Sequence, residues 1–309
     1  MKTQPSSTHK PLAIYLLVLG LLCAAVVLGA KMLGRQGAYL AQFYMLTPAL
    51  AALTTRGFFY RPRFGDALLR FGRLSDYLKY WLMSLGLVAA YFASYTLLGA
   101  VTWDLSGKIF LARLAGQFAA AGQDMNASLP PGLTAESMLL IYFVGGLTVF
   151  NILPGLISGF GEEFGHRGFM FPALYKISPA VGFLVGGLLW FGWHLPLLFI
   201  IPQTAPPPSL AQSILNTAVL AIGSIATFIY LAYVYVKSQS VLVVSLAHIA
   251  MNNGSASLSY FAAVQNQFLA NLGTVLVMLL VVALLYTRGE FRVFREHFAS
   301  AQAGHGGKP

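Results

Sequence analysis

The sequence predicts an all-α protein that crosses a membrane about eight times. Of its 309 residues, 57% are hydrophobic and only 9% are charged, and the mean hydropathy is +0.71. Charged residues make up about a quarter of a soluble globular protein, so that class is excluded. The apolar residues fall in long runs separated by short basic segments, and a membrane helix needs about 20 apolar residues.

Eight runs are apolar and long enough to be interpreted as spans: 12–30, 39–55, 78–103, 137–176, 180–200, 211–236, 240–261 and 268–287. The fourth run is too long for one straight helix, and Pro154-Gly155 is predicted to break it. Two separate spans there would place Lys237 and Arg288 outside, against the positive-inside rule. A single kinked or partly re-entrant passage is therefore favoured.

The net charge of +10 is interpreted as a set of topology signals and contacts with anionic membrane lipids, and not as a nucleic-acid surface. The most basic connection, 56–79, is predicted to be cytoplasmic and carries Arg56, Arg61, Arg63, Arg70, Arg73 and Lys79. Alternation of the spans then places both termini in the cytoplasm. The outer segments include the long polar loop 104–136 and a proline-rich connector, 202–209. The single Cys23 excludes an intrachain disulfide and a cysteine metal cluster.

Two adjacent carboxylates stand within the fourth run, in the sequence Gly-Glu162-Glu163-Phe-Gly-His-Arg167. An ionisable side chain at membrane depth costs at least about 2.5–3.5 kcal/mol, so such groups mark functional sites. In a helix, Glu162 shares a face with His166, and Glu163 shares the next face with Arg167. We expect Arg167 to neutralise Glu163 in a buried ion pair and to leave Glu162 free for chemistry, so that the two glutamates differ in role.

Two later segments supply polar partners for this pair. The first segment is Trp190-Phe-Gly-Trp-His194. Its histidine follows Ser178 by the same number of residues as Glu162 precedes it, so a turn at Ser178 would bring both side chains to the same depth in the membrane. In His248-Ile-Ala-Met-Asn252 the terminal residues share a helix face. One polar cavity, reached from the cytoplasmic side, is expected to hold all four side chains. Trp190 is interpreted as a packing or interfacial residue.

These motifs in this order resemble the CPBP family of intramembrane endopeptidases, also called Abi, which includes the CAAX prenyl endopeptidases. The residues that carry the resemblance are Glu-Glu-x-x-x-Arg, aromatic-x-x-x-His and His-x-x-x-Asn, between Gly155 and Gly254. The family's usual pattern has Phe before the motif arginine, where this chain has His166. It often has Phe at the aromatic position, where this chain has Trp190.

The resemblance implies a glutamic-type peptide hydrolase of the membrane that needs no metal or other cofactor. Glu162 with His194 would activate a water molecule, and His248 with Asn252 would stabilise the oxyanion. Glu163 and Arg167 would support the site. The implied substrate is a CAAX-type or bacteriocin-related peptide or a lipidated protein, and the expected location is a bacterial inner (plasma) membrane.

Two alternatives stay open on the sequence. Glu162, His194 and His248 form a donor set that zinc accepts, although the His-Glu-x-x-His motif of zinc proteases is absent. The site could instead belong to a non-catalytic transporter, scaffold or immunity protein. The chain is divided into N-terminal membrane helices and outer loop (1–135), a catalytic core (136–262), and a last membrane helix with a basic cytoplasmic tail (263–309).

Overall fold

The structure is a computed structural model that describes residues 9–60, 64, 66–120, 123–129, 131–200 and 209–303. It confirms an all-α polytopic membrane protein. Within the described ranges, six helical segments are long and apolar enough to span a membrane. They are α1 (His9–Met32), α4 (Leu74–Leu97), the segment Val181–Phe199, α11 (Leu210–Ser238), α12 (Val241–Ser259) and α13 (Gln267–Thr287).

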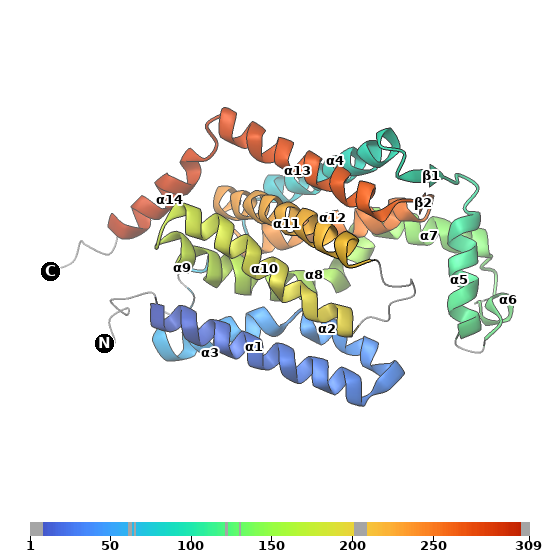
Figure 1. The fold of residues 1–309 in the computed structure, drawn as a ribbon, viewed down its shortest axis with the longest axis horizontal. Helices are drawn as coiled ribbons and strands as arrows, with labels where there is room; N and C mark the ends of the chain where they lie inside the picture. Colours follow the sequence, from blue (N-terminus) through green and yellow to red (C-terminus); the bar gives the residue numbers. More distant parts are fainter. Residues whose placement is uncertain are drawn as a thin grey trace.

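The two remaining predicted spans are divided into shorter helices. The predicted span 39–55 is divided between η1 (Gly34–Tyr39), α2 (Leu40–Tyr44) and α3 (Thr47–Phe59). The predicted passage 137–176 comprises α7 (Ala135–Leu147), α8 (Val149–Gly165), the π-helical turn η2 (His166–Met170) and α9 (Phe171–Tyr175). These four elements follow one another along the bundle in a single kinked passage (Figure 1).

The predicted break at Pro154-Gly155 is wrong, because the chain leaves the helix at Thr148. That residue has an extended backbone, with φ −118° and ψ 177°, which suits a β-branched side chain. Pro154 lies in the second turn of α8, where it removes one backbone hydrogen bond without ending the helix. Beyond it, Gly159 allows α8 to pack closely against Ile249 of α12.

Side-chain caps and a left-handed residue set the ends of the long helices. Ser209 and Gln212 form a capping box at the start of α11, and Asn266 accepts a hydrogen bond from Leu269 at the start of α13. Gln239, with φ 55°, ends α11, and Ser240 then caps α12. This two-residue connection makes α11 and α12 antiparallel neighbours at the centre of the bundle (Figure 1).

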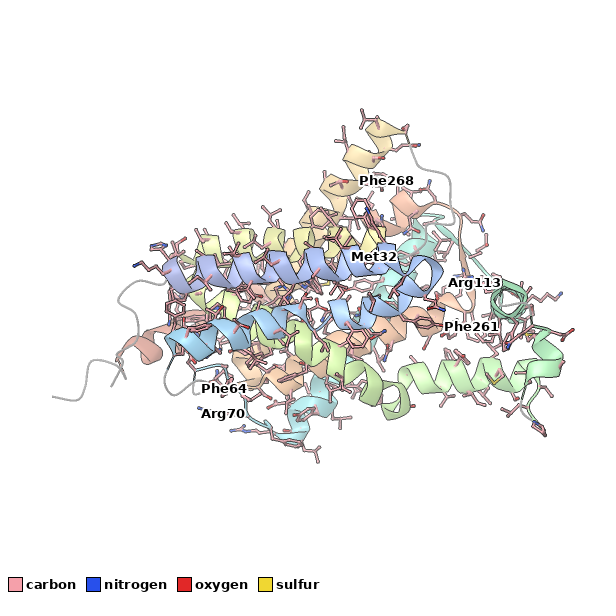
Figure 2. The ribbon with its side chains drawn as sticks, turned by 90° about the horizontal axis from the view of Figure 1, so that it is seen from below. Met32, Phe64, Arg70, Arg113, Phe261 and Phe268 are labelled. Atoms are coloured by element: carbon pink, nitrogen blue, oxygen red, sulfur yellow. The ribbon has the colours of Figure 1, made fainter. Side chains whose placement is uncertain are left out.

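Helix α1 begins and α14 ends at the same end of the bundle (Figure 1). Phe64 and Arg70 of the basic connection lie towards the same end, and Arg113 and Phe261 lie towards the other (Figure 2). Arg61, Arg63 and the connector 202–208 lie outside the described residues. The predicted outer loop contains α5 (Lys108–Ala120) and α6 (Met125–Ser128), and it begins beside β1 (Val101–Trp103), which pairs antiparallel with β2 (Ala262–Val264).

The C-terminal segment is more than a basic tail. It forms α14 (Arg292–Ala303), whose buried Phe294 and Phe298 pack against aromatic rings of α9 and η3 (Val181–Val185). Phe298 stacks on Tyr175 with ring centroids 4.3 Å apart, and Phe294 meets Phe183 edge to face. Helix α9 and η3, which follow the carboxylate pair, are thereby packed against α14.

Gly165→Ala is expected to lower the midpoint of thermal unfolding in detergent, because the added Cβ would overlap the backbone of Pro48 in α3. Overpacking of this kind costs about 1–3 kcal/mol. Gly57→Ala in α3 is the matched control, since nothing lies within 4 Å of a Cβ added there and alanine favours a helix. An unchanged midpoint for Gly165→Ala would contradict this close contact of α3 and α8.

Candidate active site

The carboxylate pair lies in the last turn of α8, which packs between α3 and α12. Glycines on α8 make this possible: Gly161 faces the backbone of Met45 and Leu46, and Gly159 faces Ile249 of α12. Glu162 and Glu163 are both buried as a result. A buried charge must be paired, so the partners of each carboxylate define the site.

Glu163 is shared by two basic side chains through one oxygen. Arg167 donates from Nη1 to Glu163 Oε1 at 2.7 Å, and His248 of α12 approaches the same oxygen through Nδ1, also at 2.7 Å. The ion pair with Arg167 confirms the i, i+4 prediction. The Arg167 guanidinium also lies over the rings of Trp190 and Phe228, 4.6 and 4.5 Å from their centroids. Glu163 thus links α8 to α12, and Arg167 links η2 to α10 (Gly186–His194) and α11.

Glu162 has a different set of neighbours, which come from α10 and α12. The indole Nε1 of Trp190 donates to Glu162 Oε1 at 2.5 Å, and His194 Nε2 lies 3.6 Å from the same oxygen. His248 Nδ1 is 4.0 Å from Oε2. The equal spacing of Glu162 and His194 about Ser178 therefore places the two side chains together, as the sequence predicts.

The hydrogen bonds of the histidines identify which ring nitrogen carries a proton. His194 Nδ1 lies 2.8 Å from the backbone oxygen of Trp190, which can only accept, so Nδ1 is the donor. In the neutral ring, Nε2 then presents a lone pair towards Glu162. His166 Nδ1 likewise donates to the backbone oxygen of Glu162, at 3.0 Å, and its ring meets Trp193 edge to face. His166 thus contacts the main chain of the pair.

Asn252 lies one helical turn beyond His248 on α12, and its side chain is exposed. The structure places it on the predicted helix but assigns it no contact with the carboxylate pair. Its role in the reaction stays a prediction. The other predicted site residues, Glu162, Glu163, Arg167, His194 and His248, form one connected cluster.

Sequence reasoning missed two residues that support this cluster. Trp190 was expected only to pack, whereas it donates to Glu162, and the signal was available because a buried indole N–H needs an acceptor. Arg56 of α3 was expected to be a topology signal, but it is buried and donates to the backbone oxygen of Gly168 at 2.6 Å. It also pairs with Asp66 at 2.6 Å. No local pattern distinguishes Arg56 from the other arginines of the basic connection.

A metal ion could find ligands in Glu162, Glu163 and His248, whose candidate ligand atoms lie within 4.8 Å of one another. The geometry fits poorly for a metal bound through Glu163 Oε1 and His248 Nδ1. Glu163 Oε1 and His248 Nδ1 are 2.7 Å apart, a hydrogen-bond distance, whereas two ligands of a tetrahedral zinc lie about 3.3 Å apart. Glu163 Oε1 also accepts from Arg167, and that positive charge repels a second cation. The predicted zinc set with His194 shares Glu162 and His248 with this group.

Comparison with known families identifies the same part of the chain. Residues 137–254 match the family model described as Type II CAAX prenyl endopeptidase Rce1-like. The matched segment includes all six predicted site residues, from Glu162 to Asn252. Comparison with curated proteins gives no match.

Arg167→Met is expected to destabilise the protein by about 3–5 kcal/mol, because it removes one partner of a buried ion pair and leaves the Glu163 carboxylate short of a cation. Thermal unfolding in detergent measures the loss. The double variant Arg167→Met with Glu163→Gln should recover part of the lost stability, since the glutamine at position 163 carries no charge that needs a cation.

Arg292→Met is the matched control for Arg167→Met, because Arg292 and Glu296 have the same i, i+4 spacing on an exposed helix face. Its midpoint should be nearly that of the wild type. Equal midpoints for Arg167→Met and Arg292→Met would contradict a structural role for the buried pair.

Proposed function

Because residues 137–254 match the family model of Rce1-like type II CAAX prenyl endopeptidases, we propose that this membrane protein hydrolyses a peptide bond by glutamate-dependent activation of water. The observation that carries the proposal is the contact between Glu162 and His194. Glu162 Oε1 and His194 Nε2 are 3.6 Å apart, so a water molecule about 2.8 Å from each would be hydrogen-bonded to both.

Glu162 is the proposed base and His194 orients the attacking water. A water held between them loses a proton to Glu162 as its oxygen attacks the scissile carbonyl, and the carbonyl oxygen becomes the oxyanion. The proton then passes from Glu162 to the leaving amine as the carbon–nitrogen bond breaks. The Trp190 N–H, 2.5 Å from Glu162 Oε1, holds the carboxylate in place without adding a charge.

His248 and Asn252 are the proposed donors to the oxyanion. Since Nδ1 of His248 donates to Glu163, Nε2 must also carry a proton if His248 is to donate to substrate. Such an imidazolium balances the charges: two carboxylates, Arg167 and His248 then sum to zero in a buried cluster. A positively charged donor stabilises an oxyanion more strongly than a neutral one.

The proposed substrate is a prenylated CAAX-type peptide or a bacteriocin-related peptide that enters from the membrane or from the cytoplasmic side. The family match supports a prenylated substrate, because it names the CAAX prenyl endopeptidases. We place the protein in a bacterial inner membrane with both termini in the cytoplasm, an orientation supported by Arg70, which lies towards the end of the bundle where α1 begins.

Glu162→Gln is expected to reduce cleavage of a quenched fluorescent farnesylated CAAX peptide by about 10²–10⁴-fold, because the amide cannot take a proton from water. Purified wild-type protein should keep its activity in the presence of a strong zinc chelator. Glu296→Gln on the exposed face of α14 is the control and should cleave at the wild-type rate. Activity that is abolished by chelator and restored by zinc would favour the zinc enzyme, for which the group Glu162, Glu163 and His248 provides candidate ligands. A wild-type protein without activity would favour the transporter or scaffold.

Asn252→Ala tests the oxyanion assignment without disturbing the buried cluster, because the Asn252 side chain is exposed. Loss of one oxyanion donor should lower kcat by about 10²–10³-fold while KM changes little. Ser259→Ala, at the end of the same helix, serves as the control. A wild-type kcat in Asn252→Ala would remove this residue from the mechanism.

A further inference from the structure

Three cavities border the helices that carry the site. One of about 700 Å³ lies between α1 and α10 and is lined in part by Trp193. A second of about 510 Å³ lies between α3 and α8 beside Phe160. The third, about 440 Å³, lies between α10, α11 and α13 and is lined in part by Trp190 and His194. We call this third cavity the α11 groove.

Of these three cavities, the α11 groove is the one lined by side chains that contact the Glu162 carboxylate. Trp190 donates to Glu162 Oε1, and His194 Nε2 lies 3.6 Å from the same oxygen. The His194 side chain is 37% exposed, whereas that of Glu162 is 5% exposed. A molecule in the groove therefore meets His194 first, with the proposed base directly behind it.

The α11 groove also differs from the other two in the chemistry of its walls. Four hydroxyl groups and one amide line it, among leucine and valine side chains: Thr217, Ser224, Thr227, Asn271 and Thr274. The cavity between α3 and α8 is lined by apolar side chains and Gly161. A lipid chain needs no hydrogen-bonding partner, but a peptide backbone away from water does. The polar wall therefore suits a peptide better than an acyl chain.

Asn271 and Thr227 are best placed to make these hydrogen bonds. Asn271 Oδ1 accepts from Gln267 at 2.9 Å, which leaves the two N–H groups of its amide as donors. Thr227 lines the groove from α11, and Leu198 and Leu220 supply apolar surface for side chains of the bound segment. By contrast, Thr217 already donates to the Ser213 backbone oxygen at 2.7 Å.

Helix packing is the competing explanation for small polar residues in these helices. Gly223 does serve that purpose, since a Cβ there would lie 2.7 Å from Val275 of α13. Asn271 and Thr227 line an open cavity instead of a close contact. The two explanations differ in what an isosteric apolar replacement would do.

We propose that the α11 groove binds an extended segment of the substrate peptide next to the scissile bond, with Asn271 and Thr227 hydrogen-bonding to its backbone. The proposal rests on the proposed peptidase function and adds a binding site to it. Both residues are positioning residues, because neither touches the proposed base or the water.

Thr227→Val and Asn271→Leu keep side-chain size and remove the hydrogen-bonding groups. Each should raise KM for the farnesylated CAAX peptide about three- to tenfold and leave kcat within about twofold, since the lost bonds bind the peptide before and during reaction. Thr287→Val, at the far end of α13, is the matched control. Wild-type KM values in both groove variants, with wild-type unfolding midpoints, would overturn the proposal.

A photocrosslinking measurement separates this proposal from the peptidase proposal, because it needs no turnover. Glu162→Gln protein is irradiated with CAAX peptides that carry photo-leucine on either side of the scissile bond, with and without excess unlabelled peptide. Crosslinks that are competed away should map to 195–198, 217–227 or 271–275. The proposal that the α11 groove binds the peptide would be overturned by crosslinks confined to the walls of the other cavities, at 16–28 or at 46–53 and 156–161. It would also be overturned if unlabelled peptide competed with no crosslink. Groove crosslinks with an inactive wild type would support peptide binding and reject hydrolysis.

Discussion

The structure around the site depends on the balance of buried charge at Glu163. Its Oε1 accepts from Arg167 and from His248, each at 2.7 Å, in a region where these side chains are buried. Removal of either partner would leave a buried carboxylate without enough hydrogen bonds and positive charge to balance it. The resulting loss of folding free energy is far larger than that from the loss of a surface pair. This requirement fixes α12 against α8. The rings of Trp190 and Phe228 over Arg167 extend the same constraint to α10 and α11.

Helices outside the matched segment 137–254 complete the support of this cluster. Arg56 of α3 donates to the Gly168 backbone oxygen in the π-helical turn next to Arg167, and its guanidinium lies near the rings of Tyr60 and Phe169. Tyr44 donates to the Trp193 backbone oxygen at 2.6 Å, next to His194. The matched segment is therefore packed against the N-terminal third of the chain and does not form a self-contained unit.

The sequence was sufficient for those features that depend on spacing within helices. The Glu163–Arg167 pair follows from i, i+4 geometry, and the meeting of Glu162 with His194 follows from equal distances to Ser178. One π-helical segment, 166–170, lies between Glu162 and Ser178, and another, 181–185, lies between Ser178 and His194. The helical rise therefore departs from the α-helical value once on each side of Ser178. Features that depend on tertiary packing were not accessible: Arg56 resembled its exposed neighbours, and the break at Thr148 has no proline or glycine at the position itself. Strands β1 and β2 have three residues each and lie far apart in the sequence, so no local pattern predicts their pairing.

The different partners of the two glutamates explain why adjacent carboxylates can have separate roles. Glu163 Oε1 accepts from the Arg167 guanidinium and from His248, so this carboxylate joins α8 to its neighbours. Glu162 Oε1 accepts from the neutral indole of Trp190 and faces Nε2 of His194. In the proposed mechanism Glu162 takes a proton from the water and then returns it to the leaving amine, and its position beside His194 gives it access to that water. His194, with 37% of its side chain exposed, contacts this carboxylate and also lines the α11 groove, the proposed binding site of the peptide.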